Sequence, residues 1–328
     1  MPNPPVPYKM VINVGGCISP WQEARIPAMD HGFLYGDSVY ETVRTFRRVP
    51  FMLERHLDRL QRSLDRIFIP LPISRKDLTA QIGRTIQAYA DLYNTEEDLV
   101  VRMVLTRGVG PIGLDFALCE QSNFIIYAFD LPPLTESLFE TGIPVVISKI
   151  RRNHPRALDP AIKSGNFLNN ILAFKDAKDA SAHEAILCNA DGYLAEGTTS
   201  NVFLIKDGLV WTPHTYGILD GITRAIVFEE ARAAGIPVGE TNIPPEALFN
   251  ADEAFITSSL KAVLGIVRVN GRLVGNGRPG PITRKLRELY LGRTVQECVA
   301  TFPRSIEGIL SQSDDGGGRT SPTPAART

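Results

Sequence analysis

Residues 159–173 constrain the fold most strongly, because their pattern changes from extended to helical around a single lysine. Lys163 follows the apolar Ile162 and precedes a Ser-Gly-Asn turn, and an amphipathic helix is predicted from about 167 to 178. A lysine at such a boundary loses hydration, which disfavours its ammonium form and makes the amine a usable nucleophile or base. The alternative is an ordinary lysine whose stem packs on apolar neighbours while its ammonium stays in water.

The rest of the chain shows the strand and helix patterns of a mixed α/β (α+β) fold. Buried strands are predicted at residues 10–14, 99–106, 124–129, 143–149 and 254–257. Further helices are predicted at about 57–67, 78–94, 223–234 and 282–291. The second half also contains three dipeptides typical of hairpin turns: Asp191-Gly192, Asp207-Gly208 and Asn270-Gly271.

A Pro-rich stretch divides the chain into two predicted domains. Residues 131–137, Leu-Pro-Pro-Leu-Thr-Glu-Ser, have the composition of a linker. We therefore expect a small α/β domain at 1–130, a linker at 131–142 and a larger α/β domain at 143–304. Residues 305–328 are rich in Ser, Gly, Pro and Thr, so a disordered tail is expected there.

Four arginines lie opposite the apolar stripe of the helix predicted at 57–67. Such a basic face is usually solvated, although one of its side chains could reach an anion. The four are Arg55, Arg59, Arg62 and Arg66.

Composition excludes several classes of protein. Lys and Arg total 35 against 36 Asp and Glu, a net charge of -1, so neither a nucleic-acid partner nor a membrane surface is indicated. The four cysteines are scattered without a CxxC pair, which predicts reduced thiols and no metal site. The N-terminal residues lack the pattern of a signal peptide, and no apolar run has the length of a membrane span. We expect a cytoplasmic protein.

Glu196 is the second residue with chemical potential. It stands in Leu194-Ala195-Glu196-Gly197, between a strand and a turn of small residues, and its apolar flanks predict partial burial. A buried carboxylate needs a cationic partner or good donors. A protonated heterocycle nitrogen would serve, and so would an arginine.

Two further segments can bind an anion. Asp220-Gly221-Ile222-Thr223 leads directly into a helix, whose free N–H groups attract a phosphate unless Asp220 or Thr223 simply caps them. Thr257-Ser258-Ser259 ends a strand in a row of hydroxyls that can also cradle a phosphate. A reactive lysine, a carboxylate able to keep a ring nitrogen protonated and two phosphate cradles are the parts that pyridoxal phosphate requires.

Taken together, these segments resemble the class IV aminotransferases, or fold-type IV pyridoxal-phosphate enzymes. The resemblance runs from about residue 13 to 291 and includes HGFLYGDSVYETVR, HLDRL, TRGVGPIGLD, LDPAIKSGNFLNN, AEGTTSNVF, LDGITR and FITSS, in the family's order. It implies two α/β domains with pyridoxal 5'-phosphate between them. It also implies a homodimer, or a higher homo-oligomer, whose active site borrows a loop from the partner.

The resemblance also implies roles for individual residues. Lys163 would be the catalytic Schiff-base lysine, and Glu196 would pair with the pyridine nitrogen. The phosphate would be bound by Arg59, Ile222, Thr223, Ser258 and Ser259, and the substrate would be faced by Tyr35, Tyr40, Arg44 and Arg102. Phe167 stands where many members have a tyrosine that hydrogen-bonds the cofactor's ring hydroxyl.

The closest likeness within the family is to branched-chain amino-acid aminotransferases. The segment Gly110-Pro111-Ile112-Gly113-Leu114-Asp115 has their Gly-Leu-Asp and lacks the Arg-x-His that D-amino-acid enzymes use. The implied reaction is transamination between a branched-chain amino acid and 2-oxoglutarate. The alternatives are a D-amino-acid or amine transaminase, an aminodeoxychorismate-type lyase and a pyridoxal-phosphate carrier without turnover.

Overall fold

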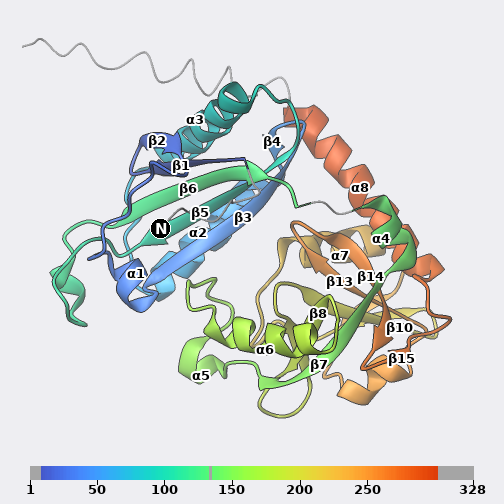
Figure 1. Ribbon diagram of the computed structural model, residues 1–328. Helices are drawn as coiled ribbons and strands as arrows, with labels where there is room; N and C mark the ends of the chain where they lie inside the picture. The colour runs from blue at the N-terminus through green and yellow to red at the C-terminus, as the bar shows by residue number, and fades with distance from the viewer. Residues whose placement is uncertain (1–8, 133–134, 302–328) are drawn as a thin grey trace, which may run out of the picture.

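The chain is a mixed α/β protein built on two β-sheets, as the sequence predicts. A computed structural model describes residues 9–132 and 135–301, and the predicted tail at 305–328 lies outside them. The first sheet belongs to the N-terminal half (residues 9–132) and the second to the C-terminal half (residues 135–301). Figure 1 shows the two sheets beside each other, with α5 and α6 below the first sheet and α8 at the upper right, above the second sheet.

The first sheet has six strands, all paired antiparallel in the order β2-β1-β6-β5-β3-β4. One face of this sheet is covered by α2 (Leu53–Arg66) and α3 (Arg75–Tyr93). The short α1 (His31–Tyr35) precedes β3, and η1 (Phe116–Leu118) lies between β5 and β6. The strands are β1 (Met10–Val14), β2 (Cys17–Pro20), β3 (Ser38–Phe46), β4 (Val49–Pro50), β5 (Leu99–Thr106) and β6 (Asn123–Asp130).

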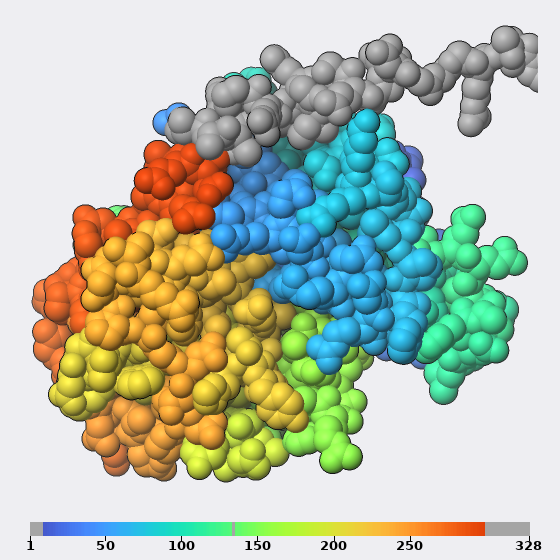
Figure 2. Space-filling view, turned by 180° about the vertical axis from the view of Figure 1, so that it is seen from behind, coloured from blue at the N-terminus to red at the C-terminus, as the bar shows by residue number. Residues whose placement is uncertain are grey.

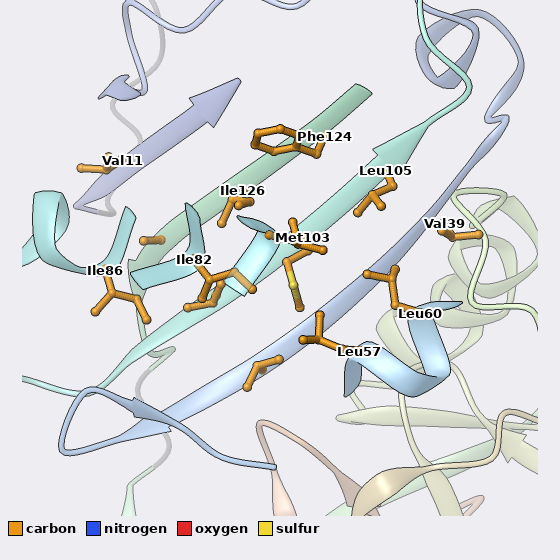
Figure 3. Close-up of a cluster of buried hydrophobic side chains, with 14 of the residues drawn as sticks. Val11, Val39, Leu57, Leu60, Ile82, Ile86, Met103, Leu105, Phe124 and Ile126 are labelled. Atoms are coloured by element: carbon orange, nitrogen blue, oxygen red, sulfur yellow. The ribbon is translucent and has the colours of Figure 1, made fainter. Parts of the chain in front are cut away.

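Alternation along β3 gives this sheet two different faces. Val39 and Val43 join the core beneath α2 and α3, because successive side chains of a strand point to opposite faces. Figure 3 shows that core, with Leu57 and Leu60 of α2 near Met103 of β5. The opposite face remains available for a site in the space between the halves.

The second sheet has nine strands, in the order β12-β11-β10-β13-β14-β7-β8-β9 with β15 paired to β14. Parallel pairing joins β11 to β12, β14 to β7 and β7 to β8, and the other neighbours are antiparallel. The strands are β7 (Ile143–Arg151), β8 (Glu184–Cys188), β9 (Leu194–Gly197), β10 (Asn201–Lys206), β11 (Leu209–Thr212), β12 (Val238–Glu240), β13 (Glu253–Ser258), β14 (Ala262–Val269) and β15 (Arg272–Leu273).

Helices cover both faces of the second sheet. One core packs against α7 (Ile222–Ala233) and α8 (Pro281–Thr301), and the other includes side chains of α4 (Glu136–Thr141) and η2 (Pro245–Phe249). The lysine segment lies between α5 (Pro155–Leu158) and α6 (Leu168–Asp179). Two helices change the predicted boundaries: α8 continues ten residues beyond 291, and α4 occupies part of the expected linker.

The predicted hairpin turns form where expected. β8 pairs with β9, β10 with β11 and β14 with β15, each across one of the three dipeptides. In Asp207-Gly208 and Asn270-Gly271 both residues have positive φ, as a type I′ turn requires.

Side chains of the two halves pack against each other. Phe51, from the connection between β4 and α2, is 6% exposed and belongs to the core formed by α7, α8 and the second sheet. Its ring makes an edge contact with Tyr290 of α8, with centroids 5.8 Å apart. Figure 2, seen from behind, shows the N-terminal half (blue) lying directly against the C-terminal half (yellow and orange).

Candidate active site

A cavity of about 300 Å³ lies between the two sheets. The outer face of the first sheet supplies Tyr40, Thr42, Arg102 and Phe129. The lysine segment supplies part of the wall, and turns at the ends of β9, β13 and the loop before α7 supply the rest. The volume is at the lower end of the range for small-molecule sites.

Lys163 reaches this cavity from a segment that is pinned to the first sheet. Tyr40 N donates to Lys163 O at 2.9 Å, and Lys163 N donates to Ser63 Oγ at 3.2 Å. Its half-buried side chain places Nζ 3.3 Å from the Tyr40 hydroxyl and 4.4 Å from the ring centroid. No carboxylate of the described residues forms an ion pair with Nζ, so this amine is available for chemistry.

Glu196 lines the same cavity and is paired with an arginine. Its Oε1 accepts from Arg152 Nε at 2.7 Å, and its Oε2 accepts from Leu219 N at 2.9 Å. Glu196 is 4% exposed, which confirms the predicted burial. Of the two cations considered from the sequence, the arginine is therefore present, and the carboxylate retains lone pairs for one more donor.

The start of α7 forms one predicted anion cradle. Gly221, which has no side chain, is the N-cap residue. No side-chain hydrogen bond caps the helix, so neither Asp220 nor Thr223 acts as a cap. A Cβ at Gly221 would lie 2.0 Å from Asn201 Oδ1, which explains the glycine there. The first N–H groups of α7 therefore lack a side-chain partner and favour an anion.

The end of β13, predicted as the second anion cradle, lines the same cavity as the start of α7. Thr257, Ser258 and Ser259 line the cavity together with Ile222 and Thr223. Thr257 is 1% exposed, and its Oγ1 has no hydrogen-bond partner among the described residues. A buried hydroxyl without a partner is costly, so this atom favours a ligand in the cavity.

Arg59 differs from the solvated face predicted for its helix, because it is 5% exposed and lines the cavity. Its Nε donates to Glu41 Oε1 at 2.6 Å, and its NH1 donates to Asp220 O at 2.8 Å, beside the start of α7. Of the five donors of a guanidinium, some remain for an anion. Arg62 and Arg66 are exposed, as predicted.

Glu41 and His56 hold Arg59 from behind. His56 Nδ1 lies 2.7 Å from Glu41 Oε2, so a neutral imidazole with its proton on Nδ1 donates to the carboxylate. Burial raises the pKa of Glu41, but the charge of Arg59 and the hydrogen bonds from Arg59 and His56 outweigh it and hold that pKa well below its usual range. Burial lowers the pKa of His56, against the opposing effect of Glu41.

The four predicted substrate residues divide into two pairs. Tyr40 and Arg102 line the cavity, and the Arg102 guanidinium lies 3.9 Å from the Tyr40 ring centroid. Tyr35 does not line it: this side chain is 38% exposed on α1, and its hydroxyl accepts from Gly113 N. Arg44 lies farther along β3, over the Phe46 ring at 4.5 Å, and does not line the cavity either.

Phe167 packs on Tyr40 rather than on a polar partner. The two rings meet edge to face with centroids 5.4 Å apart. Phenylalanine has no hydroxyl to offer. The phenol within hydrogen-bond distance of the lysine amine is that of Tyr40.

Sequence reasoning missed several residues of the site. Arg152 and Lys261 line the cavity, whereas Glu41 and His56 act behind it. The detectable signals were Glu41 within a strand of otherwise apolar alternation and Arg152 directly after β7, since buried charges mark polar sites. Among the described residues, no three His, Cys, Asp or Glu side chains are grouped as metal ligands would be. None of the described helices is long and apolar enough to cross a membrane.

Comparisons with known proteins agree with this geometry. The family model of amino-transferase class IV matches residues 38–269. A Methanocaldococcus jannaschii protein, provisionally named a branched-chain-amino-acid aminotransferase, is 36% identical over 282 residues, which cover 86% of this chain and 95% of that protein. The D-alanine aminotransferase of Bacillus licheniformis is 31% identical, over 89% of this chain and 100% of its own.

A solved structure is similar as well. The branched-chain amino acid aminotransferase of Thermobaculum terrenum, in its PLP-bound holo form, superposes with a TM-score of 0.76 at 26% identity. The match covers 88% of this chain and 94% of that chain.

Proposed function

Because this chain belongs to the class IV aminotransferases, we propose that it transfers the amino group of a branched-chain amino acid to 2-oxoglutarate. The family uses pyridoxal 5'-phosphate. One observation carries the proposal: Lys163, Glu196 and the start of α7 border a single cavity. These are the groups that would hold the reactive carbon, the ring nitrogen and the phosphate of that cofactor.

The residues around the cavity fit pyridoxal phosphate. Thr257 Oγ1, buried without a partner, and the uncapped first turn of α7 leave donors that a phosphate would satisfy. Arg59 would add charge-assisted hydrogen bonds from the side, and Ser258 and Ser259 would complete the cradle. Glu196 would accept a hydrogen bond from the protonated ring nitrogen, and Lys163 would hold the cofactor through a Schiff base.

When bound, the cofactor supplies an electron sink for the bond electrons of the substrate's α-carbon. Lys163 Nζ would act on the proton of the substrate's α-carbon, first as general base and then as general acid. Tyr40, 3.3 Å from Nζ, would orient this amine during the transfer. Arg152 would keep the Glu196 carboxylate in place against Leu219 N.

The walls of the cavity favour an apolar substrate with a carboxylate. Phe129, Phe167, Ile162 and Leu260 supply apolar surface, as a branched side chain requires. Arg102 donates to no described residue and could bind a carboxylate. A D-amino-acid transaminase is the second candidate, because the D-alanine enzyme is 31% identical over its whole length.

Lys163→Ala tests the proposal directly. We expect the variant to lose both the visible absorption of the lysine-bound cofactor and all transamination, while Lys149→Ala, an exposed lysine on β7, keeps both. Absorption spectra and single-turnover mixing with L- and D-amino acids measure these outcomes. A visible band that persists in Lys163→Ala would refute the role of this lysine.

The same spectra separate the alternative functions. Conversion of the wild-type cofactor by L-leucine supports the branched-chain enzyme, and conversion by D-alanine alone would replace it with the D-amino-acid enzyme. Pyruvate formed from an aminodeoxychorismate-type substrate without any acceptor would identify a lyase. A spectrum that no amino acid changes would identify a carrier.

We also propose the predicted domains at 1–130 and 143–304, with their site at the interface, in a cytoplasmic homodimer. Two observations support the dimer: Phe33, Ile112 and Leu114 are 73%, 76% and 84% exposed, and Tyr35, which shares α1 with Phe33, accepts a hydrogen bond from Gly113 N, between the other two. Apolar side chains so exposed are typical of an interface. Sedimentation equilibrium would show a monomer if this is wrong.

A further inference from the structure

Lys261 is a cation of the cavity to which neither the predicted roles nor the proposed chemistry assigns a task. It stands in the turn between β13 and β14, immediately after the hydroxyls of the second anion cradle. Its backbone N donates to Ser258 Oγ at 3.1 Å, which ties the turn to the end of β13. Its side chain is 26% exposed and the residue lines the cavity.

A buried carboxylate fixes the position of the Lys261 ammonium. Glu184 of β8 is fully buried, and its Oε2 accepts from Lys261 Nζ at 2.9 Å. The same carboxylate accepts from Thr198 N and Ser200 Oγ, each at 3.1 Å, in the turn after Glu196. Burial alone would raise the pKa of Glu184, but Lys261 and the Thr198 hydroxyl outweigh it and keep the group ionised.

The ammonium of Lys261 has a donor left over. An ammonium carries three N–H donors. Glu184 takes one, and Thr199 Oγ1 takes another at 3.1 Å. No other acceptor among the described residues takes the third, so a fixed, partly exposed ammonium offers a hydrogen bond in the cavity.

Arg102, on the other sheet, also has N–H donors without an acceptor. Within the described part of the chain its guanidinium contacts the Tyr40 ring but donates no hydrogen bond and forms no ion pair. The other two arginines of the cavity are ion-paired, Arg59 with Glu41 and Arg152 with Glu196, and the proposed function already assigns both, with Lys163, to the cofactor. The cavity therefore has two cations with open donors and no proposed role toward the cofactor, one from β5 and one from the β13–β14 turn.

We propose that Lys261 and Arg102 together select a dicarboxylate, with Lys261 donating to one carboxylate and Arg102 to the other. An amino acid with an apolar side chain has one carboxylate and can engage one cation at a time. A five-carbon 2-oxo diacid, or the corresponding amino acid, can engage both. This inference rests on the proposed transamination and makes Lys261 a specificity-determining residue for the acceptor.

Binding of unreactive acids to the cofactor-loaded enzyme tests the inference. Glutarate carries two carboxylates and 4-methylvalerate carries one, and neither has an amino or oxo group that could react. We expect wild-type enzyme to bind glutarate more tightly in calorimetric titrations. Lys261→Met should weaken the binding of glutarate about tenfold. The dissociation constant of 4-methylvalerate divided by that of glutarate should therefore fall, because 4-methylvalerate can still use Arg102.

Two further variants keep the result interpretable. Glu184→Gln/Lys261→Met removes the buried carboxylate that Lys261→Met alone would leave unpaired, and it should show the same loss of ratio. Lys206→Met, which breaks a surface ion pair with Asp252, should leave the ratio unchanged. An unchanged ratio in both Lys261 variants would mean that the lysine only neutralises Glu184, and would overturn the inference.

Failure of the transaminase proposal has a different signature. It would appear as a wild-type cofactor spectrum that no amino acid changes. The glutarate ratio can be measured whichever way that result falls, because neither acid depends on turnover.

Discussion

At the scale of single residues, buried charges organise this site more than the reactive groups themselves do. Glu41, Glu184 and Glu196 are each buried, and each is paired with one cation that borders the cavity. A buried carboxylate left without its partner is strongly destabilising. The three pairs therefore hold Arg59, Lys261 and Arg152 in place before any ligand binds.

The group behind Arg59 should make stability depend on pH. Burial lowers the pKa of His56 below its usual 6.5, so below that pH the unfolded chain binds a proton that the folded chain does not. The free energy of unfolding should then fall by up to about 1.4 kcal/mol per pH unit. Glu41, whose pKa is also lowered, adds a loss of the same sign below pH 4.5. Urea unfolding between pH 7 and 5 measures the first effect.

Substitution separates His56 from the other titrating groups. His56→Gln keeps a donor for Glu41 but cannot take up the proton, so the slope between pH 6.5 and 5 should become shallower. His183→Gln, at an exposed position, should leave the slope as it is. Equal slopes in wild type and His56→Gln would show that His56 does not carry the effect.

At the residue scale, the sequence singled out two residues that border the cavity, and in both cases local context was sufficient. The turn and apolar flanks around Lys163, and the small residues around Glu196, are local patterns, and both residues border the cavity. The burial of Arg59 depends on Glu41, which is 18 residues away in the chain, and helical periodicity records only which side of a helix a residue occupies. Arg152 was missed for the same reason, since its partner, Glu196, lies 44 residues away in the chain.

At the scale of elements, the start of α7 is the most demanding part of the fold. Gly221 leaves room for the Asn201 side chain, whose Nδ2 donates to Leu219 O at 2.9 Å. Gly221→Ala would force Asn201 to turn and would displace the first N–H groups of α7. We expect cofactor affinity to fall about tenfold, or about 1.4 kcal/mol, in fluorescence titrations of the apoenzyme.

A matched glycine controls for helix propensity. Gly292 lies inside α8, and a Cβ there would meet nothing within 4 Å. Gly292→Ala should stabilise the helix by about 1 kcal/mol and leave cofactor affinity unchanged. If Gly221→Ala binds the cofactor as tightly as Gly292→Ala does, the start of α7 is not part of the phosphate site.

Element prediction was most accurate for strands and turns. The buried strands follow from short apolar runs and the three hairpins from residues that tolerate positive φ, and both signals are local. The last ten residues of α8 were missed because charged residues interrupt the apolar stripe there. The helix α4 was missed because the Pro-rich residues before it are typical of a linker.

At the scale of the whole molecule, the site exists only while the two halves stay together. Tyr40 and Arg102 come from the first sheet, whereas Glu196 and Lys261 come from the second. Sequence patterns predicted both halves, but not how they join, because that contact depends on side chains remote from each other in the chain. Phe51 is the clearest case, since it belongs to the N-terminal half but packs into the core beneath α7 and α8.

Phe51→Ala should therefore uncouple the halves. Removing a buried phenylalanine costs about 3–5 kcal/mol, and here the loss falls on the contact between the halves. Trp21 lies in the N-terminal half and Trp211 in the C-terminal half, so Trp211→Phe and Trp21→Phe backgrounds report on each half separately. In wild type we expect the two urea transitions to coincide, and in Phe51→Ala we expect them to separate.

The matched control truncates a phenylalanine within one half. Phe124 belongs to the core between the first sheet and α2 and α3. Phe124→Ala should lower the midpoint reported by Trp21 while the contact at Phe51 remains intact. Separate transitions in wild type would show that the halves already fold independently. Coincident transitions in Phe51→Ala would show that α8 and the lysine segment couple the halves without this side chain.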